Sequence, residues 1–154
     1  MSLPTIECFA HAEEMPGISA ESLTGRAVEV LGACVGAKGE AVPALLGDLE
    51  EVEVSLVDDA AIAAVHEEFM NDSTPTDVIT FHHGEIVISV ETAIRYAEEQ
   101  GHPAEREALL YVIHGLLHLN GHDDLSEPAR EIMHQTQERL LAMVWPLPMP
   151  ENRE

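Results

Sequence analysis

The sequence predicts an α+β fold in which a mixed four-stranded sheet packs with four to five helices. Segments with the two-residue alternation of strands are interspersed along the chain with segments of helical periodicity. Two short apolar segments, 78–81 and 85–90, are separated by only three residues, which is typical of a hairpin. The length of 154 residues fits one domain, residues 1–154, with residues 146–154 as a tail.

The first half of the chain contains two predicted strands, each followed by a helix. Residues 5–10 (TIECFA) form the first strand. The segment 19–39 is predicted to be helical and to stop at Gly39, because apolar side chains recur at helical spacing: Leu23, Ala27, Val30, Leu31 and Cys34. Residues 51–57 (EVEVSLV) alternate apolar and polar side chains, as a half-buried strand does. Asp58 or Asp59 can cap the helix that follows to Met70.

The second half begins with a polar loop at 71–77, which contains Pro75, and continues into the hairpin strands. A helix is predicted over 91–101, ending at a glycine. The next helix, 104–120, follows Pro103 and has an almost wholly apolar interior, so it should lie in the core. Asn120-Gly121 is a strong stop signal. The last helix is predicted over 127–145.

The composition excludes some classes of partner. The formal charge is −22, and residues 39–94 contain 13 Asp or Glu residues and no Lys or Arg. Such a surface should repel phosphate backbones, which argues against DNA and any other nucleic acid, although saline adaptation also explains acidity. No apolar run reaches the roughly 18 residues of a membrane span, and the N-terminus does not resemble a secretory signal. Cys8 and Cys34 are therefore expected to be free cytosolic thiols.

The stretch HGLLHLNGHDD, residues 114–124, contains a metal-type pattern. His114 and His118 lie four residues apart, so both imidazoles point from one face of the predicted core helix. Burying an imidazole without a partner costs on the order of 1–3 kcal/mol. Either a metal ion or hydrogen bonds in the core must therefore satisfy them.

The third ligand is predicted to be Asp124 rather than His122. If the helix continued, His114 and His122 would lie about 12 Å apart, too far for one zinc ion to bind both. A turn at Gly121 lets Asp124 return past the helix end. This two-histidine, one-carboxylate set favours Zn²⁺, and other divalent metals such as iron, manganese or nickel also suit it. Gly115 occupies the position of the general-base glutamate in HExxH metalloproteases, which argues against that mechanism.

The same stretch resembles the signature of the YbeY-type family of bacterial rRNA maturation endoribonucleases, similar to H-G-x-L-H-L-x-G-[YH]-D-H. PTDVITF, residues 75–81, resembles the family's PTDVLSF segment, and GEIVIS, residues 84–89, resembles its GDIVIS strand. The order of elements agrees from about residue 50 to 145.

This resemblance implies a zincin-like fold, distantly similar to zinc metalloproteases, and a site with one Zn²⁺ ion. It implies cleavage of single-stranded ribosomal RNA in small-subunit maturation and ribosome quality control, in the cytoplasm. We expect His114, His118 and Asp124 to hold the metal and His114 to be catalytic. Ribosomal proteins or a ribosome-associated GTPase are the expected protein partners, and no membrane or DNA is expected.

The chain departs from the family pattern in four places. Asp124 replaces the third histidine, Met70 stands where a basic residue is usual, Glu85 replaces an aspartate, and the hairpin turn is short. Without an arginine at position 70, the chain lacks the forked guanidinium group that would contact a phosphate. Arg95 and Arg106 are the nearest arginines in sequence that could replace it. Two alternatives therefore stay open: a metal-dependent hydrolase of another substrate, and a non-catalytic ribosome assembly factor.

Other polar residues near these motifs have two interpretations each. Glu85 and Asp123 either orient a metal-binding histidine or are ordinary surface acids and caps. His82 and His83, in the hairpin turn, either reach the substrate or are solvated turn residues.

Overall fold

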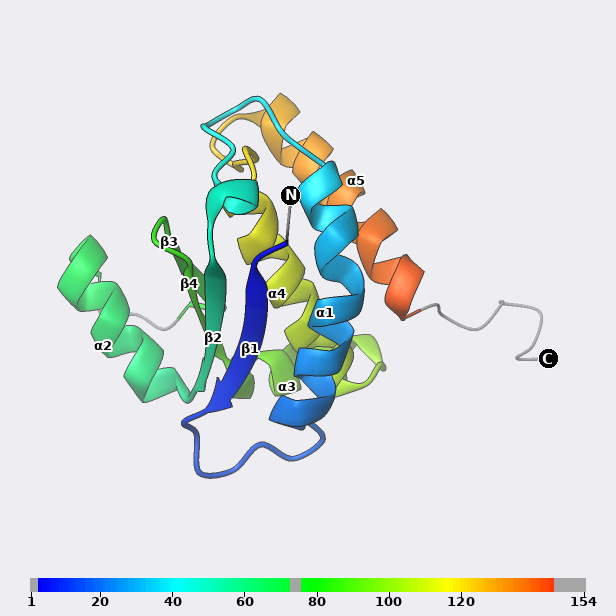
Figure 1. Ribbon diagram of the computed structural model, residues 1–154. Coiled ribbons are helices and arrows are strands. Elements are labelled where there is room, and N and C mark those ends of the chain that lie inside the picture. The colour runs from blue at the N-terminus through cyan, green and yellow to red at the C-terminus, as the bar shows by residue number, and fades with distance from the viewer. Residues whose placement is uncertain (1–2, 73–75, 146–154) are drawn as a thin grey trace.

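The computed structural model describes residues 3–72 and 76–145 and has a four-stranded sheet with helices on both faces (Figure 1). The strand order is β1-β2-β4-β3. Strands β1 (Thr5–Ala10), β2 (Glu51–Val57) and β4 (Glu85–Ser89) run parallel, and β3 (Val78–Phe81) pairs antiparallel with β4 at the edge. The predicted α+β class, the mixed four-stranded sheet and the hairpin are confirmed.

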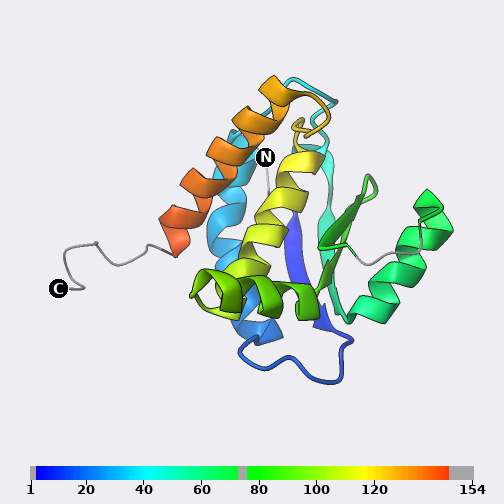
Figure 2. The same ribbon diagram turned by 180° about the vertical axis from the view of Figure 1, so that it is seen from behind.

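Helix α2 (Asp59–Met70) covers one face of the sheet, and the other helices gather on the opposite side (Figures 1 and 2). There, α1 (Ala20–Gly36) and α4 (Ala104–Leu119) lie against the strands. Helices α3 (Val90–Gln100) and α5 (Glu127–Val144) pack on α4. A short 3-10 helix, η1 (Leu46–Asp48), precedes β2.

The alternation of side chains along the strands builds a core on each face of the sheet. Val52, Val54 and Leu56 of β2 belong to the large core with α1 and α4. Ile79 and Val87 point the other way and pack with Ile62 of α2, together with Val57, Val65 and Phe81. Helix α4 is the centre of the large core, as its apolar interior predicts, so its polar residues are held on a rigid element.

Gly115 lets α4 lie directly on the sheet. A Cβ atom at this position would come within 2.8–3.0 Å of three side-chain atoms of Ile86 on β4. Real Cβ atoms do not approach other atoms so closely, so a larger residue would push the helix away from the strand. The glycine that argues against the HExxH mechanism therefore has a packing role.

Most element boundaries agree with the prediction, and two differ for physical reasons. Helix α1 ends at Gly36 rather than Gly39, because the Gly39 backbone instead donates to Asn120 O at 2.9 Å and packs on Gly121. Val90 begins α3 rather than ending β4, since the Ser89 side chain caps that helix by accepting from Thr92 N at 3.2 Å. The predicted tail 146–154 and loop residues 73–75, with Pro75, lie outside the described residues.

Cys8 and Cys34 are free, as the sequence predicts, and the structure buries both. Burial raises the pKa of the Cys8 thiol to about 11 and that of Cys34 to about 12. Across residues 3–72 and 76–145, none of the helices combines the length and apolarity that crossing a bilayer requires.

Candidate metal centre

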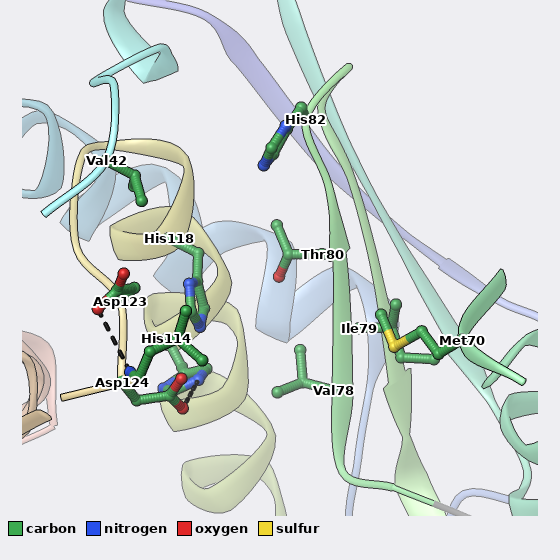
Figure 3. Close-up of a pocket in the computed structure, with 11 residues that line it drawn as sticks. Val42, Met70, Val78, Ile79, Thr80, His82, His114, His118, Asp123 and Asp124 are labelled. Carbon is green, nitrogen blue, oxygen red and sulfur yellow. Dashed lines mark hydrogen bonds and ion pairs between the residues drawn. The ribbon is translucent and has the colours of Figure 1, made fainter. Parts of the chain in front are cut away.

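A cavity of about 280 Å³ lies between α4 and the edge strand β3, and the loop from α4 to α5 borders it (Figure 3). His114 and His118 project into it from α4, and Asp123 and Asp124 lie on the loop. Val78 and Thr80 of β3, and His82 in the turn just after it, point toward the helix from the other side. Val42 and Met70 also line the cavity, which therefore joins segments that are far apart in the sequence.

Ligand atoms of His114, His118 and Asp124 all lie within 4.8 Å of one another. The two imidazole rings are 4.7 Å apart between centroids and nearly perpendicular, at 78°. His114 Nε2 lies 3.9 Å from Asp124 Oδ2. Ligand atoms on a tetrahedral zinc ion are separated by about 3.4 Å. Separations of up to 4.8 Å therefore need to shorten by about 1.4 Å at most to close the set on one ion. The donors fit a divalent metal of the zinc type.

The turn at Gly121 separates Asp124 from His122. Gly121 has a φ of +102°, and a Cβ atom there would clash with the carbonyl oxygen of Gly39. After this turn, the His122 ring is buried, and its Nε2 lies 2.8 Å from Ala37 O, 85 residues away in sequence. Since its ring is engaged there, His122 is absent from the cluster, as the helix geometry predicts.

Gln137 on α5 orients His114. The Nδ1 of His114 lies 3.0 Å from Gln137 Oε1. Because an amide oxygen can only accept, this contact favours the tautomer with the proton on Nδ1, which leaves Nε2, 3.9 Å from Asp124 Oδ2, free to bind a metal ion. Sequence reasoning missed this residue. Gln137 lies in a polar helix 23 residues downstream of His114, and no local pattern distinguishes it from Gln135.

His118 is kept neutral by its surroundings. Burial lowers the pKa of this imidazole, and the neighbouring His114 adds to the effect. Asp124, Asp123 and a hydrogen bond with the His122 backbone act in the opposite direction but do not outweigh it. A neutral imidazole is the form that binds a metal ion.

Of the other polar residues considered in the sequence, some line the cavity and others do not. Glu85 orients neither metal-type histidine: its Oε1 lies 3.3 Å from His83 Nε2 in the hairpin turn, which corrects that hypothesis. Asp123 lines the cavity, and its Oδ1 accepts from Leu125 N at 3.3 Å, so it stabilises the loop. His82 lines the cavity, whereas His83 is exposed and stacks on Phe81.

No lysine or arginine is among the described residues that line the cavity. Met70 lies at its edge with Ile79, on the far side of β3 from the histidines (Figure 3). Neither suggested substitute lines the cavity. Arg95 forms an ion pair with Asp59 at 2.7 Å, and Arg106 lies near the start of α4. The described lining of the cavity thus lacks an arginine fork.

The chain is similar to known proteins over most of its length. The sequence model of endoribonuclease YbeY matches residues 18–144. The chain is 42% identical over 100 residues to endoribonuclease YbeY of Rhodopirellula baltica, covering 58% of this chain and 52% of that protein. It is 33% identical over 158 residues to endoribonuclease YbeY of Moorella thermoacetica, covering 90% of this chain and 97% of that protein.

Solved structures contain the same fold. The solution structure of TM1509 from Thermotoga maritima superposes with a TM-score of 0.63 at 27% identity, covering 91% of this chain and 89% of the other. The family expected from the sequence motifs is confirmed by the match over residues 18–144 and by the Moorella relative. The chain belongs to the endoribonuclease YbeY family.

Proposed function

We propose that this protein is a metal-dependent endoribonuclease that cuts single-stranded RNA during maturation of small-subunit ribosomal RNA and in ribosome quality control. The observation that supports it is the convergence of His114, His118 and Asp124 in one cavity, in a chain whose relatives are named endoribonucleases. The absence of a glutamate at position 115 argues against the peptidase chemistry of HExxH enzymes.

The proposed cofactor is one Zn²⁺ ion held by His114 Nε2, His118 and an Asp124 carboxylate oxygen. Two imidazoles and one carboxylate are a usual catalytic zinc set, which leaves one coordination position open. When bound, such an ion supplies Lewis-acid stabilisation for the charge that develops on a phosphoryl group. Asp124 contributes a negative charge, which also suits other divalent metals.

The residues of the chain prepare this site before substrate arrives. Gln137 holds the tautomer of His114, the proposed catalytic residue, and burial keeps His118 neutral. Thr80 faces the histidines from β3 and can position a phosphate oxygen by donating a hydrogen bond. His82 and Asp123 are the remaining titratable groups among the described lining residues, so they are the candidates to move a proton.

The proposal extends to location and partners. Two buried, free cysteines suit a reducing compartment, which supports a cytoplasmic location. The strongly acidic chain suits basic ribosomal proteins as partners, and a ribosome-associated GTPase is the other proposed contact.

The test is an RNA cleavage assay with a panel of divalent metals. The purified chain should cut single-stranded RNA, stop with chelator, and recover with added Zn²⁺. His114→Ala should abolish cleavage, whereas His134→Ala, an exposed histidine on α5, should leave it unchanged. A chain that holds metal and hydrolyses a simple phosphodiester but leaves RNA intact would contradict the proposed substrate.

A further inference from the structure

An exposed cluster of aromatic rings lies on the hairpin and the adjacent end of α2. Phe69, next to the last residue of α2, meets Phe81 of β3 edge to face, with ring centroids 5.1 Å apart and planes at 73°. The imidazole of His83 stacks on the Phe81 ring, with centroids 5.7 Å apart and planes at 20°. We call Phe69, Phe81 and His83 the aromatic platform. None of the three lines the candidate metal cavity itself.

Two of the three rings are open to solvent. Phe69 is 61% exposed, and the side chain of His83 is 72% exposed. Phe81 instead packs against the small core under α2, so a ring fixed in that core supports the exposed His83 ring. The Nε2 of His83 also lies 3.3 Å from Glu85 Oε1, which limits how far the ring can turn away. One face of the His83 ring is therefore covered by Phe81, and the other is available to a further flat group.

Exposed rings are unusual in this chain, which has only three phenylalanines, two tyrosines and one tryptophan. Two of the three phenylalanines belong to the aromatic platform. Met70, which is 52% exposed, extends its apolar surface. Burying side chains of this size usually stabilises a protein, so a cluster of them left in solvent is typical of a binding surface.

The aromatic platform adjoins the candidate metal cavity. Met70, which follows Phe69, and His82, which lies between Phe81 and His83, both line that cavity (Figure 3). Strand β3 is at the edge of the sheet, and no strand of the described residues lies beyond it. A flexible chain bound in the cavity can therefore continue around the edge of β3 onto the platform.

The charge of this region decides which occupant fits. Residues 39–94, which include the whole platform, contain 13 Asp or Glu residues and no Lys or Arg. A second copy of the chain would bring the same negative charge and be repelled. RNA is also negative, but its charge is on the phosphates, whereas its bases are neutral and flat. A base can stack on the rings while the phosphates stay in solvent.

We propose that the aromatic platform binds unpaired bases of single-stranded RNA by stacking and so anchors the strand beside the candidate metal cavity. One base stacks on the open face of His83, in continuation of the Phe81–His83 stack, and a neighbouring base packs against Phe69. The contact tolerates any sequence, because every base has a π face. This inference rests on the proposed nuclease function for its substrate, but RNA binding can be measured without cleavage.

The first experiment measures the affinity of labelled single-stranded RNA by fluorescence anisotropy, in chelator to prevent cleavage. Phe69→Leu keeps an apolar side chain but removes the ring, so it should weaken binding about tenfold. Phe9→Leu is the matched control, because Phe9 is 38% exposed on β1, at the opposite edge of the sheet. It should bind like the wild type. Unchanged affinity in Phe69→Leu would overturn the proposal.

Variants of His83 test the stack independently. His83→Ala should weaken binding, and His83→Trp, which offers a larger ring, should strengthen it. The dependence of log affinity on log salt should keep its slope in Phe69→Leu, because no phosphate contact is lost. A shallower slope would contradict stacking. Thermal melting checks that each variant folds. If Phe69→Leu fails to fold, His83→Trp still decides, and affinity equal to the wild type in that variant would refute the platform.

The second experiment detects stacking directly with 2-aminopurine, a fluorescent base that is quenched when it stacks. Its fluorescence in single-stranded RNA should fall on binding to the wild type and fall less with Phe69→Leu. Cleavage of RNA with no effect of the platform variants on affinity would refute the platform and leave the nuclease function intact. Affinity that depends on the platform in a chain that cuts no RNA would support the platform and refute the nuclease function.

Sedimentation velocity of the same samples tests the competing occupant. The wild type and Phe69→Leu should sediment alike. A wild type that forms dimers, together with a monomeric Phe69→Leu that binds RNA equally well, would assign the platform to a contact between copies and refute base stacking.

Discussion

His114 lies between two partners on opposite sides of its ring, and Gln137 decides which nitrogen is available to a metal. Nδ1 contacts Gln137 Oε1 at 3.0 Å, and Nε2 lies 3.9 Å from Asp124 Oδ2. Partners of this kind typically contribute 10–100-fold to metal affinity. We expect Gln137→Ala to weaken Zn²⁺ binding by about this factor, measured by competition with a chelating dye.

Gln135→Ala provides the control for this variant, since Gln135 lies on the same helix but is exposed and bonds to Glu131. It should bind Zn²⁺ like the wild type. Equal affinities in the two variants would show that Gln137 does not orient His114.

Comparing Asp124→Ala with His122→Ala should show which of the two residues binds the metal and which only stabilises the fold. We expect Asp124→Ala to lose bound metal, since it removes the only carboxylate of the cluster among the described residues. His122→Ala should retain metal but lower the free energy of unfolding by about 1–3 kcal/mol, because it removes a buried hydrogen bond with Ala37 O.

Elemental analysis of metal content and urea denaturation check both expectations. Metal loss in His122→Ala with retention in Asp124→Ala would reverse the assignment. Loss in both, with normal folding, would mean that the His122 turn itself positions Asp124.

Gly115→Ala should lower the free energy of unfolding by about 1–3 kcal/mol, because the added methyl group would overlap the Ile86 side chain. Gly25→Ala on α1 is the matched control: its Cβ would meet nothing within 4 Å, so it should stabilise the protein by about 0.5–1 kcal/mol. Urea denaturation measures both. A stabilising Gly115→Ala would show that α4 does not need this close contact with β4.

The ionisation of Asp59 should make the free energy of unfolding depend on pH in the acidic range. Burial opposes ionisation, but hydrogen bonds from Ser89, Arg95 and Thr92 outweigh it and lower the pKa of Asp59 below its usual 3.8. The folded state thus favours the ionised carboxylate. Its contribution is present above the unfolded pKa and is lost as the pH falls through the lower folded pKa.

Asp59→Asn is the variant that tests this. It should be less stable than the wild type by about 1–3 kcal/mol at pH 7, with a difference that shrinks as the pH falls below 4. Urea denaturation at pH 7, 5 and 3 measures the trend. A difference that is constant over this range would show that the charge of Asp59 is not involved.

Local patterns were sufficient to predict the elements because burial is periodic. The apolar spacing of α1 names the five residues that the structure buries on it. The strand order β1-β2-β4-β3 was not predictable in this way, since pairing depends on contacts between distant segments. The end of α1 was mispredicted at Gly39 for the same reason, because that glycine serves a contact with Gly121.

The candidate site likewise contains residues that local patterns predict and residues that only the packing of distant segments brings together. His114 and His118 follow from spacing on one helix, and the Gly121 turn pointed to Asp124, although metal binding by these residues stays a prediction. Gln137 gave no signal in the sequence. Its contact with His114 arises from how α5 packs on α4, and no local pattern encodes that packing.

Met70→Arg should strengthen RNA binding, because it restores a basic residue at the edge of a cavity that has no lysine or arginine among its described lining residues. Each phosphate newly neutralised on a single strand should steepen the dependence of log affinity on log salt by about 0.7. Fluorescence anisotropy with labelled single-stranded RNA, in chelator to prevent cleavage, measures affinity and slope together. Met143→Arg, at an exposed position near the far end of α5, adds the same charge away from the site. If both variants strengthen binding equally, the effect comes from net charge, and position 70 does not contact the RNA backbone.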